Sequence, residues 1–197
     1  ITRRAGRPIQ ITAVADRNVD YARSLVGDAV RVTGDVFSVV TDPEIDIVVE
    51  LIGGYEIARE VVMAAIEHGK HVVTANKALL AVHGNEIFAA AQKKGVMVAF
   101  EAAVAGGVPI IKALREGLSA NRIEWIAGII NGTTNFILSE MRDKGLDFEV
   151  VLKEAQRLGY AEADPTFDIE GVDAAHKATI MSAIAFGIPV QFDKAYV

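Results

Sequence analysis

The segment from Gly159 to Lys177 (GYAEADPTFDIEGVDAAHK) contains the residues whose types and spacing best suit acid–base chemistry. Asp173 and Lys177 stand four positions apart, so a helix that begins at Gly171 would place both side chains on one face. A lysine beside carboxylates at a helix start suits a buried polar site with a tuned proton donor. A solvated acidic loop with a surface ion pair explains the same charges equally well. The carboxylates of the segment belong to Glu162, Asp164, Asp168, Glu170 and Asp173.

Apolar patterns along the chain predict the elements that hold this segment. The run ATIMSAIAFG predicts a buried continuation of the helix, which Gly187 and Pro189 would end. Upstream, strand and helix patterns alternate over about ninety residues, which predicts a right-handed, doubly wound parallel sheet of the α/β class. IDIVVEL, residues 45–51, is nearly all apolar and suits a strand buried on both faces. We expect strands at 9–15, 45–51, 71–74 and 96–100, and helices at 19–25, 36–40, 55–68 and 83–94.

From residue 104 onward the pattern changes to a mixed α+β region. RIEWIAGII, residues 122–130, predicts a longer strand, and the following turn leads into a helix that Thr133 or Thr134 would cap. Free N–H groups at such a helix start suit a substrate carboxylate, although capping alone explains the residues equally well. We expect further helices at 109–116, 136–144 and 148–158, an incomplete nucleotide-binding domain at 1–103 and an incomplete catalytic, substrate-binding and dimerisation domain at 104–197.

Asp16 and Arg17 follow the first expected strand and suit a dinucleotide. A carboxylate at this place can bind the adenosine ribose, whereas Arg17 could accept a 2′-phosphate, so NAD and NADP both stay open. An aspartate that only forms a turn before Asn18 is an equally good explanation. The glycine fingerprint G-x-G-x-x-G is not present in the sequence. We therefore expect a fragment that begins after that turn, is truncated at both ends and binds cofactor weakly by itself.

Gly53-Gly54 and Lys77 each follow an expected strand. Ligands of α/β proteins lie at the carboxyl ends of the strands, where glycines allow close approach to the backbone. A tight turn and a solvated lysine at a helix start are the simpler structural explanations. The sequence alone leaves both explanations open.

Composition limits the classes of function. The net charge of −6 and the lack of a basic stripe argue against a nucleic-acid partner. The chain has no cysteine, which excludes a thioester mechanism, while direct hydride transfer between an alcohol and a carbonyl remains open. No apolar run has transmembrane length and no signal-peptide pattern is present, which is consistent with a cytoplasmic location and with no membrane partner.

The pattern A-x-A-D-P-x-x-D-I-x-G-x-D-x-x-x-K resembles the signature of homoserine dehydrogenases. Acids, glycine, proline and lysine at set spacing are far more specific than a lone glycine motif. The runs VVELIGG, VTANKALLA, FEAAVAGGVPII and GIINGTTNFIL occur in the order of that family, and the resemblance covers nearly the whole chain. It implies a Rossmann-type NAD- or NADP-dependent oxidoreductase that interconverts L-aspartate 4-semialdehyde and L-homoserine, in the biosynthesis of threonine, methionine and isoleucine.

The resemblance also implies roles for individual residues. Lys177 would exchange a proton with the substrate hydroxyl, Asp173 would orient it, and Lys77 would supply a second positive charge. A bound sodium ion, held by backbone oxygens, would join the two domains; close packing of a small-residue segment is the simpler reading. The implied sets are Glu162, Asp168, Gly132 and Thr133 for substrate, Asp16, Gly53, Gly54, Thr74, Asn76 and Lys77 for cofactor, and Glu101, Val104, Gly106 and Val108 for sodium.

Two other functions remain open. The chain could belong to another NAD(P)-dependent reductase of a polar amino-acid carbonyl, or it could be a non-catalytic fragment that only folds and dimerises. The apolar runs RIEWIAGII and ATIMSAIAF suit a subunit interface, and the family is commonly dimeric, so we expect a homodimer.

Overall fold

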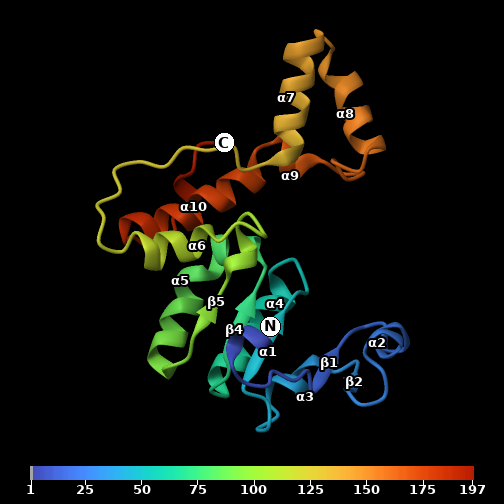
Figure 1. Cartoon of the computed structure of the whole chain (residues 1–197), viewed down its shortest axis with the longest axis vertical. Coiled ribbons are helices and arrows are strands. Elements are labelled where there is room, and N and C mark those ends of the chain that lie inside the picture. Colours follow the sequence, from blue (N-terminus) through green and yellow to red (C-terminus); the bar gives the residue numbers. More distant parts are fainter. Residues whose placement is uncertain (1) are drawn as a thin grey trace. The chain divides into compact units, whose positions relative to one another are not determined.

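The computed structural model describes residues 2–197, which form two compact units (Figure 1). Unit 1 contains the chain up to residue 52 together with residues 56–73 and 86–99. Unit 2 contains residues 53–55, 74–85 and 100–197. The chain therefore passes between the units several times, and a division into two domains after residue 103 stays a prediction.

Unit 1 contains a two-stranded sheet in which β1 and β2 are parallel. Side chains cap the helices: Asn18 accepts the N–H of Tyr21, and Asp35 accepts the N–H of Phe37. The sequence did not indicate β2, because three residues are too few for alternation to stand out. These elements are α1 (Thr2–Ala5), β1 (Ala13–Ala15), α2 (Val19–Val26), β2 (Arg31–Thr33) and α3 (Val36–Val40).

A second sheet has the order β3-β4-β5, in which Val72 of β4 lies opposite Val98 of β5 in a parallel pair. Helix α4 contacts β3 and buries Val61, Val62 and Ile66. The alternation of parallel strands with helices confirms the expected α/β class. These elements are β3 (Ile47–Glu50), α4 (Glu56–Glu67), β4 (His71–Thr74), α5 (Lys77–Lys94) and β5 (Val98–Ala99).

One face of β3 is buried and the other is open. Val48 and Glu50 are buried, whereas Ile47 and Val49 are 51% and 59% exposed. The expectation of a strand buried on both faces is therefore wrong for the described residues, because nothing in residues 2–197 covers Ile47 and Val49.

Helix α5 begins at Lys77, not at His83 as the sequence pattern indicated. The Asn76 carboxamide oxygen accepts the N–H of Leu79 at 3.0 Å and so caps the first turn. Residues 78–81 are alanine and leucine, which are strong helix formers. The cap and these residues together extend the helix toward its N-terminus.

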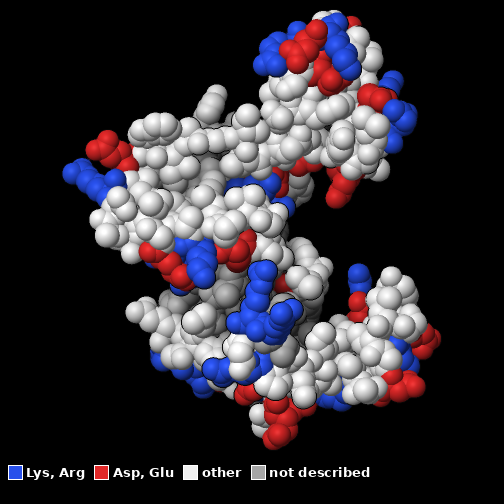
Figure 2. All heavy atoms as spheres, viewed as in Figure 1, with Lys and Arg blue, Asp and Glu red and all other residues white. Residues whose placement is uncertain are grey.

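Unit 2 is mainly helical. Helices α7 and α8 form a hairpin that buries Ile137, Val151 and Ala155, and they lie side by side in Figure 1. Figure 2 shows positive and negative side chains together at the end of this hairpin, where Arg142 pairs with Asp143. The elements are η1 (Glu101–Ala103), α6 (Ile110–Lys112), η2 (Ala113–Gly117), α7 (Gly132–Lys144), α8 (Phe148–Arg157), α9 (Thr166–Ile169), α10 (Val172–Phe186) and η3 (Phe192–Lys194).

The segment 122–130 forms no strand, so the strand expected there is a wrong prediction. Trp125 and Ile129 are 73% and 79% exposed, which leaves their apolar side chains in solvent. A strand needs a neighbour whose backbone completes its hydrogen bonds, and no segment within residues 2–197 pairs with this one. The β-branched composition alone is not sufficient.

Helix α10 follows Gly171, as the sequence predicts, and it contacts α9 and η2. Gly171 has a φ of 75°, a left-handed conformation that favours glycine. Beyond the end of α10, the Asn85 carboxamide donates to the Val190 carbonyl oxygen at 2.9 Å and accepts the Val190 N–H at 2.8 Å. These two bonds tie α5 to the segment that follows α10.

Candidate functional site

A pocket of about 540 Å³ in unit 2 lies between the start of α7, the turn before α9, α9 itself and α10. Most of its polar side chains come from the acidic segment singled out in the sequence and from the turn that precedes α7. The structure therefore brings these two distant segments together. The lining residues are Asn131, Gly132, Thr133, Phe136, Gly159, Tyr160, Asp168, Asp173 and Lys177.

The ammonium group of Lys177 lies at this pocket, and its side chain is only 16% exposed. Nζ donates to the Asp173 carboxylate at 2.6 Å and to the Ile130 carbonyl oxygen at 2.7 Å. Lys177 and Asp173 meet across one turn of α10, as their spacing predicts. An ammonium group has three N–H donors, so one remains for a bound ligand.

Asp173 is the centre of the charged cluster and is 6% exposed. Lys77, from the first turn of α5, places its Nζ 3.1 Å from the second oxygen of this carboxylate. Burial raises the pKa of Asp173, but hydrogen bonds from Lys177, Asn131 and Lys77 outweigh burial and hold the pKa below its ordinary value. Asp173 is therefore an anion at neutral pH, and it keeps two lysines beside each other.

Asn131 is a site residue that the sequence analysis missed. It is 7% exposed, and its Nδ2 donates to Asp168 at 2.7 Å and to Asp173 at 2.9 Å. Its Oδ1 accepts the N–H of Thr134 at 2.8 Å, so Asn131 caps α7 in place of the expected threonines. The available signal was its place directly before the helix, where asparagine is a favoured cap.

Gly132 and Thr133 form the first turn of α7 and line the pocket. The Thr133 hydroxyl donates to the Tyr160 carbonyl oxygen at 2.6 Å, which fixes the pocket wall opposite the helix start. Within the described residues, the backbone N–H groups of Gly132 and Thr133 have no partner. The start of α7 therefore offers these two donors to an anion.

The other acids of the segment differ in position. Asp168 lines the pocket, where Asn131 holds its carboxylate. Glu162 is exposed and does not line the pocket, so the structure does not bring it into the cluster. Asp164 accepts the N–H and the hydroxyl of Thr166 at 3.1 and 2.6 Å, so its carboxylate shapes the turn before α9.

His176 is a second residue that the sequence analysis did not single out. Its ring contacts Phe192 and Phe167, with centroid distances of 4.5 and 6.3 Å, and its buried Nδ1 has no hydrogen-bond partner within the described residues. Burial lowers the pKa of His176 and the charge of Lys77 lowers it further, while Asp173 raises it. The imidazole is therefore neutral at pH 7 and adds no third positive charge to the cluster.

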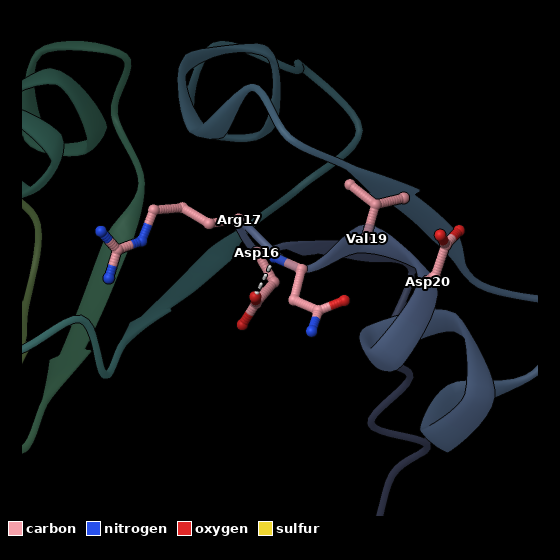
Figure 3. A pocket seen from close by; sticks show the side chains of 5 residues that line it. Asp16, Arg17, Val19 and Asp20 are labelled. Atoms are coloured by element: carbon pink, nitrogen blue, oxygen red, sulfur yellow. Dashed lines mark hydrogen bonds between the residues drawn. The ribbon is translucent and has the colours of Figure 1, made fainter.

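Asp16, a predicted cofactor residue, lies in unit 1 beside a pocket of about 650 Å³. One of its carboxylate oxygens accepts the N–H of Asn18 at 2.7 Å, which forms the turn that the sequence also allowed (Figure 3). The Arg17 side chain extends away from Asp16 in the same view. The second carboxylate oxygen of Asp16 has no partner within the described residues. This oxygen therefore remains available to accept a hydrogen bond from a ligand.

Asn76 links the turn after β4 to Gly53-Gly54 within unit 2. Its Nδ2 donates to the Gly54 carbonyl oxygen at 2.6 Å, and the Thr74 hydroxyl oxygen accepts its N–H at 2.9 Å. Gly53 and Gly54 have φ values of 79° and 64°, and a side chain added at either would meet open space. The backbone of this turn is therefore accessible to a bound group.

Glu101 opens the small-residue loop that the sequence analysis connected with sodium. Its carboxylate accepts the N–H groups of Ile111 and Lys112, both at 2.9 Å, and so binds the start of α6. The side chain thus has a structural partner, and a cation in this loop would meet the backbone oxygen of Glu101. Within the described residues, no group of three or more histidine, aspartate or glutamate side chains is suited to a metal.

The loop after Glu101 presents backbone oxygens in a tight turn. The carbonyl oxygens of Val104 and Gly106 accept no hydrogen bond within the described residues, whereas that of Val108 accepts the N–H of Ile110 at 2.8 Å. Ala105 has a φ of 48°, and within residues 2–197 it is the one residue other than glycine with a positive φ. Unpaired carbonyl oxygens in a strained turn fit a hard cation.

Comparison with known proteins places the chain in a family. A profile described as "Homoserine dehydrogenase, NAD binding domain" matches residues 1–101, and one described as "Homoserine dehydrogenase" matches residues 109–197. The chain belongs to the homoserine dehydrogenase family. Homoserine dehydrogenases of Pseudomonas aeruginosa and Neisseria gonorrhoeae are 69% and 64% identical to it over 196 residues. The chain is covered completely in both comparisons and spans 45% of the length of each relative.

Solved structures of homoserine dehydrogenases have the same fold. The enzyme of Thiobacillus denitrificans superposes with a TM-score of 0.94 at 75% identity, over 99% of this chain and 45% of that one. A hyperthermophilic archaeal homoserine dehydrogenase in complex with NADPH has a TM-score of 0.75 at 33% identity, over 84% of this chain and 51% of that one. These likenesses confirm the resemblance that the motifs indicated.

Proposed function

We propose that the protein containing this chain interconverts L-aspartate 4-semialdehyde and L-homoserine with NAD or NADP, in the biosynthesis of threonine, methionine and isoleucine. Family membership supports the proposal, and the observation that carries it is the meeting of Lys77 and Lys177 at the Asp173 carboxylate. Two ammonium groups at one buried anion are suited to stabilise and protonate an alkoxide.

Lys177 is the proposed acid. When bound, the reduced nicotinamide supplies the hydride that the aldehyde carbon accepts. Lys177 donates the proton that turns the aldehyde oxygen into the hydroxyl of homoserine, and it takes the proton back in the reverse direction. Asp173 orients Lys177 through the 2.6 Å hydrogen bond, and Lys77 adds positive charge near the developing oxyanion.

The pocket supplies partners for both charged groups of an amino acid, the ammonium and the carboxylate. Asp168 would accept the substrate ammonium, and the free N–H groups of Gly132 and Thr133 would bind the carboxylate. Glu162 is proposed as a second acceptor of the ammonium, although it is exposed and lies outside the pocket lining. These roles would make the pocket specific for an α-amino acid.

Each unit contains residues that we propose as partners of the cofactor. Asp16 is the proposed partner of the adenosine ribose, and the accessible Gly53-Gly54 turn would lie against the nicotinamide half. Asn76 and Thr74 would hold that turn in place through the hydrogen bonds described above. The name of the matching profile and the NADPH complex of the archaeal relative support this assignment.

A monovalent cation, sodium, is proposed at the loop after η1. The backbone oxygens of Glu101, Val104, Gly106 and Val108 would hold it, and its role would be structural. Replacing sodium by choline in the buffer is expected to lower the melting temperature of the full-length protein. An unchanged melting temperature would argue against the site.

A homodimer is proposed from the exposed apolar side chains of residues 122–130 and from the family resemblance. Sedimentation of the full-length protein measures this directly, and a monomer at micromolar concentration would contradict it. The division into a cofactor domain at 1–103 and a catalytic domain at 104–197 is retained as part of the proposal. Within residues 2–197, no helix has the length and apolar composition needed to cross a membrane. The cytoplasmic location stays a prediction.

A pair of matched aldehydes tests the substrate assignment. L-Aspartate 4-semialdehyde and succinate semialdehyde differ by the α-amino group, so only the first offers an ammonium to Asp168. We expect kcat/KM of the full-length protein, measured by loss of nicotinamide absorbance, to be at least about 100-fold higher for the amino acid. Equal values for the two aldehydes would show that the pocket does not recognise the amino group.

A further inference from the structure

Every polar group of the Asn131 carboxamide has a partner. The nitrogen donates to Asp168 and Asp173, and the oxygen accepts the N–H of Thr134 at 2.8 Å and its hydroxyl at 2.9 Å. Because the carboxylates can only accept and the Thr134 N–H can only donate, turning the carboxamide over would break these three bonds. The side chain is therefore held in a single orientation.

The two carboxylates that Asn131 binds come from different helices. Asp168 belongs to α9 and Asp173 to α10, yet one oxygen of each lies within hydrogen-bond distance of the same nitrogen. Like charges that approach each other raise one another's pKa, and carboxylate pairs without donors between them share a proton. One N–H group of Asn131 opposes this at Asp173 by lowering its pKa, and the other holds the Asp168 carboxylate in place.

We propose that Asn131 is a positioning residue, which holds the carboxylates of Asp168 and Asp173 in place and through them aligns the substrate ammonium with Lys177. The inference rests on the proposed function and extends it to a residue that contacts neither reacting atom. Since the same side chain caps α7, it also fixes the free N–H donors of Gly132 and Thr133. The Asn131 carboxamide thereby positions the proposed acceptor of the ammonium, Asp168, and the partner of Lys177, Asp173. It also positions the N–H donors that would bind the substrate carboxylate.

The variant Asn131→Ser separates positioning from capping. Serine caps helices as well as asparagine does, so α7 keeps its cap, but the hydroxyl is too short to reach both carboxylates. The control is Asn135→Ser, which changes an exposed asparagine one turn along the same helix. Both variants are made in the full-length protein and compared by melting temperature, kcat, KM and pH profile.

We expect kcat/KM for Asn131→Ser to fall about 10- to 100-fold, because each lost bond joined a donor to a charged group. The acid limb of its pH profile moves to higher pH, since without the N–H donor of Asn131 the pKa of Asp173 rises. The melting temperature stays close to that of Asn135→Ser. A kcat/KM within twofold of the control together with an unmoved acid limb would overturn the proposal.

A second measurement does not depend on turnover. The unfolding free energy lost between neutral and acid pH is expected to be smaller in Asn131→Ser than in Asn135→Ser, because the pKa of Asp173 in the folded protein is less depressed. If the unmodified protein fails to reduce the semialdehyde, the proposed function is wrong, and this difference still decides the role of Asn131. If serine impairs folding, Asn131→Asp keeps the capping oxygen, and its kcat/KM must fall at least as far.

Discussion

Replacing Lys177 by alanine in the full-length protein is expected to lower kcat by about 10²- to 10⁴-fold, which is the usual contribution of a positioned general acid. KM should change only a few-fold, because the lost group acts on the reacting oxygen and not on the substrate carboxylate or ammonium. The fold should persist, since Asp173 retains Lys77 and Asn131 as partners. Steady-state rates with either nicotinamide cofactor measure the loss.

Two further variants test whether the loss of turnover is specific to proton donation by Lys177. Lys177→Arg keeps the positive charge but holds its proton too tightly to donate it, so it should remain nearly as slow as the alanine variant. Lys153→Ala, an exposed lysine on α8, serves as the control and should keep normal turnover. Added ethylamine should restore part of the rate to Lys177→Ala. Near-normal turnover of Lys177→Ala would show that Lys177 is not the proton donor.

The Asp173→Asn substitution is expected to have the largest combined effect on stability and turnover. Without the carboxylate, the ammonium groups of Lys77 and Lys177 lose the anion that both of them contact, and their like charges repel each other. Because the position is buried, we expect the free energy of unfolding to drop by about 2 to 4 kcal/mol. Steady-state rates should show a fall in kcat as well, because Lys177 loses the hydrogen-bond partner that orients it.

The pH dependence of stability gives an independent test of Asp173. An ordinary aspartate has a pKa of about 3.9, and that of Asp173 is lower in the folded protein. Its contribution is therefore fully present above about pH 4 and is lost as the pH falls through the lowered value. The difference in unfolding free energy between the unmodified protein and Asp173→Asn should be constant near neutral pH and shrink below about pH 4.

The exposed Asp164→Asn variant is the matched control, because the same substitution falls in the same segment at a residue that only binds Thr166. It should leave turnover unchanged and lower stability slightly. Equal losses of turnover and of unfolding free energy in Asp164→Asn and Asp173→Asn would mean that the contacts of Asp173 with Lys77 and Lys177 have no special role.

Local patterns predicted the elements whose signals lie within a few residues. Strand β4 has the expected bounds, His71–Thr74, because a β-branched run stands between a helix end and a helix start. The acid–lysine pair of α10 followed from a spacing of four residues. By contrast, whether residues 122–130 form a strand and whether both faces of β3 are buried depend on neighbouring segments. A local sequence pattern does not contain that information.

Asn131 shows why part of the site could not be predicted. Its partner Asp173 is 42 residues away in sequence, so only the packing of α7, α9 and α10 reveals their contact. Without that contact an asparagine before a helix predicts a cap and nothing more. Glu162 is the reverse case, since a motif assigned it to the substrate and the structure leaves it exposed.

The two hydrogen bonds between Asn85 and Val190 help to fix the spacing between the ammonium groups of Lys77 and Lys177. Lys77 and Asp173 join the starts of α5 and α10, and the Asn85–Val190 pair joins the middle of α5 to the segment that follows α10. All four residues belong to unit 2. A hinge outside unit 2 would therefore leave the spacing of the two ammonium groups unchanged, and the proposed proton donor and the proposed oxyanion partner would move together.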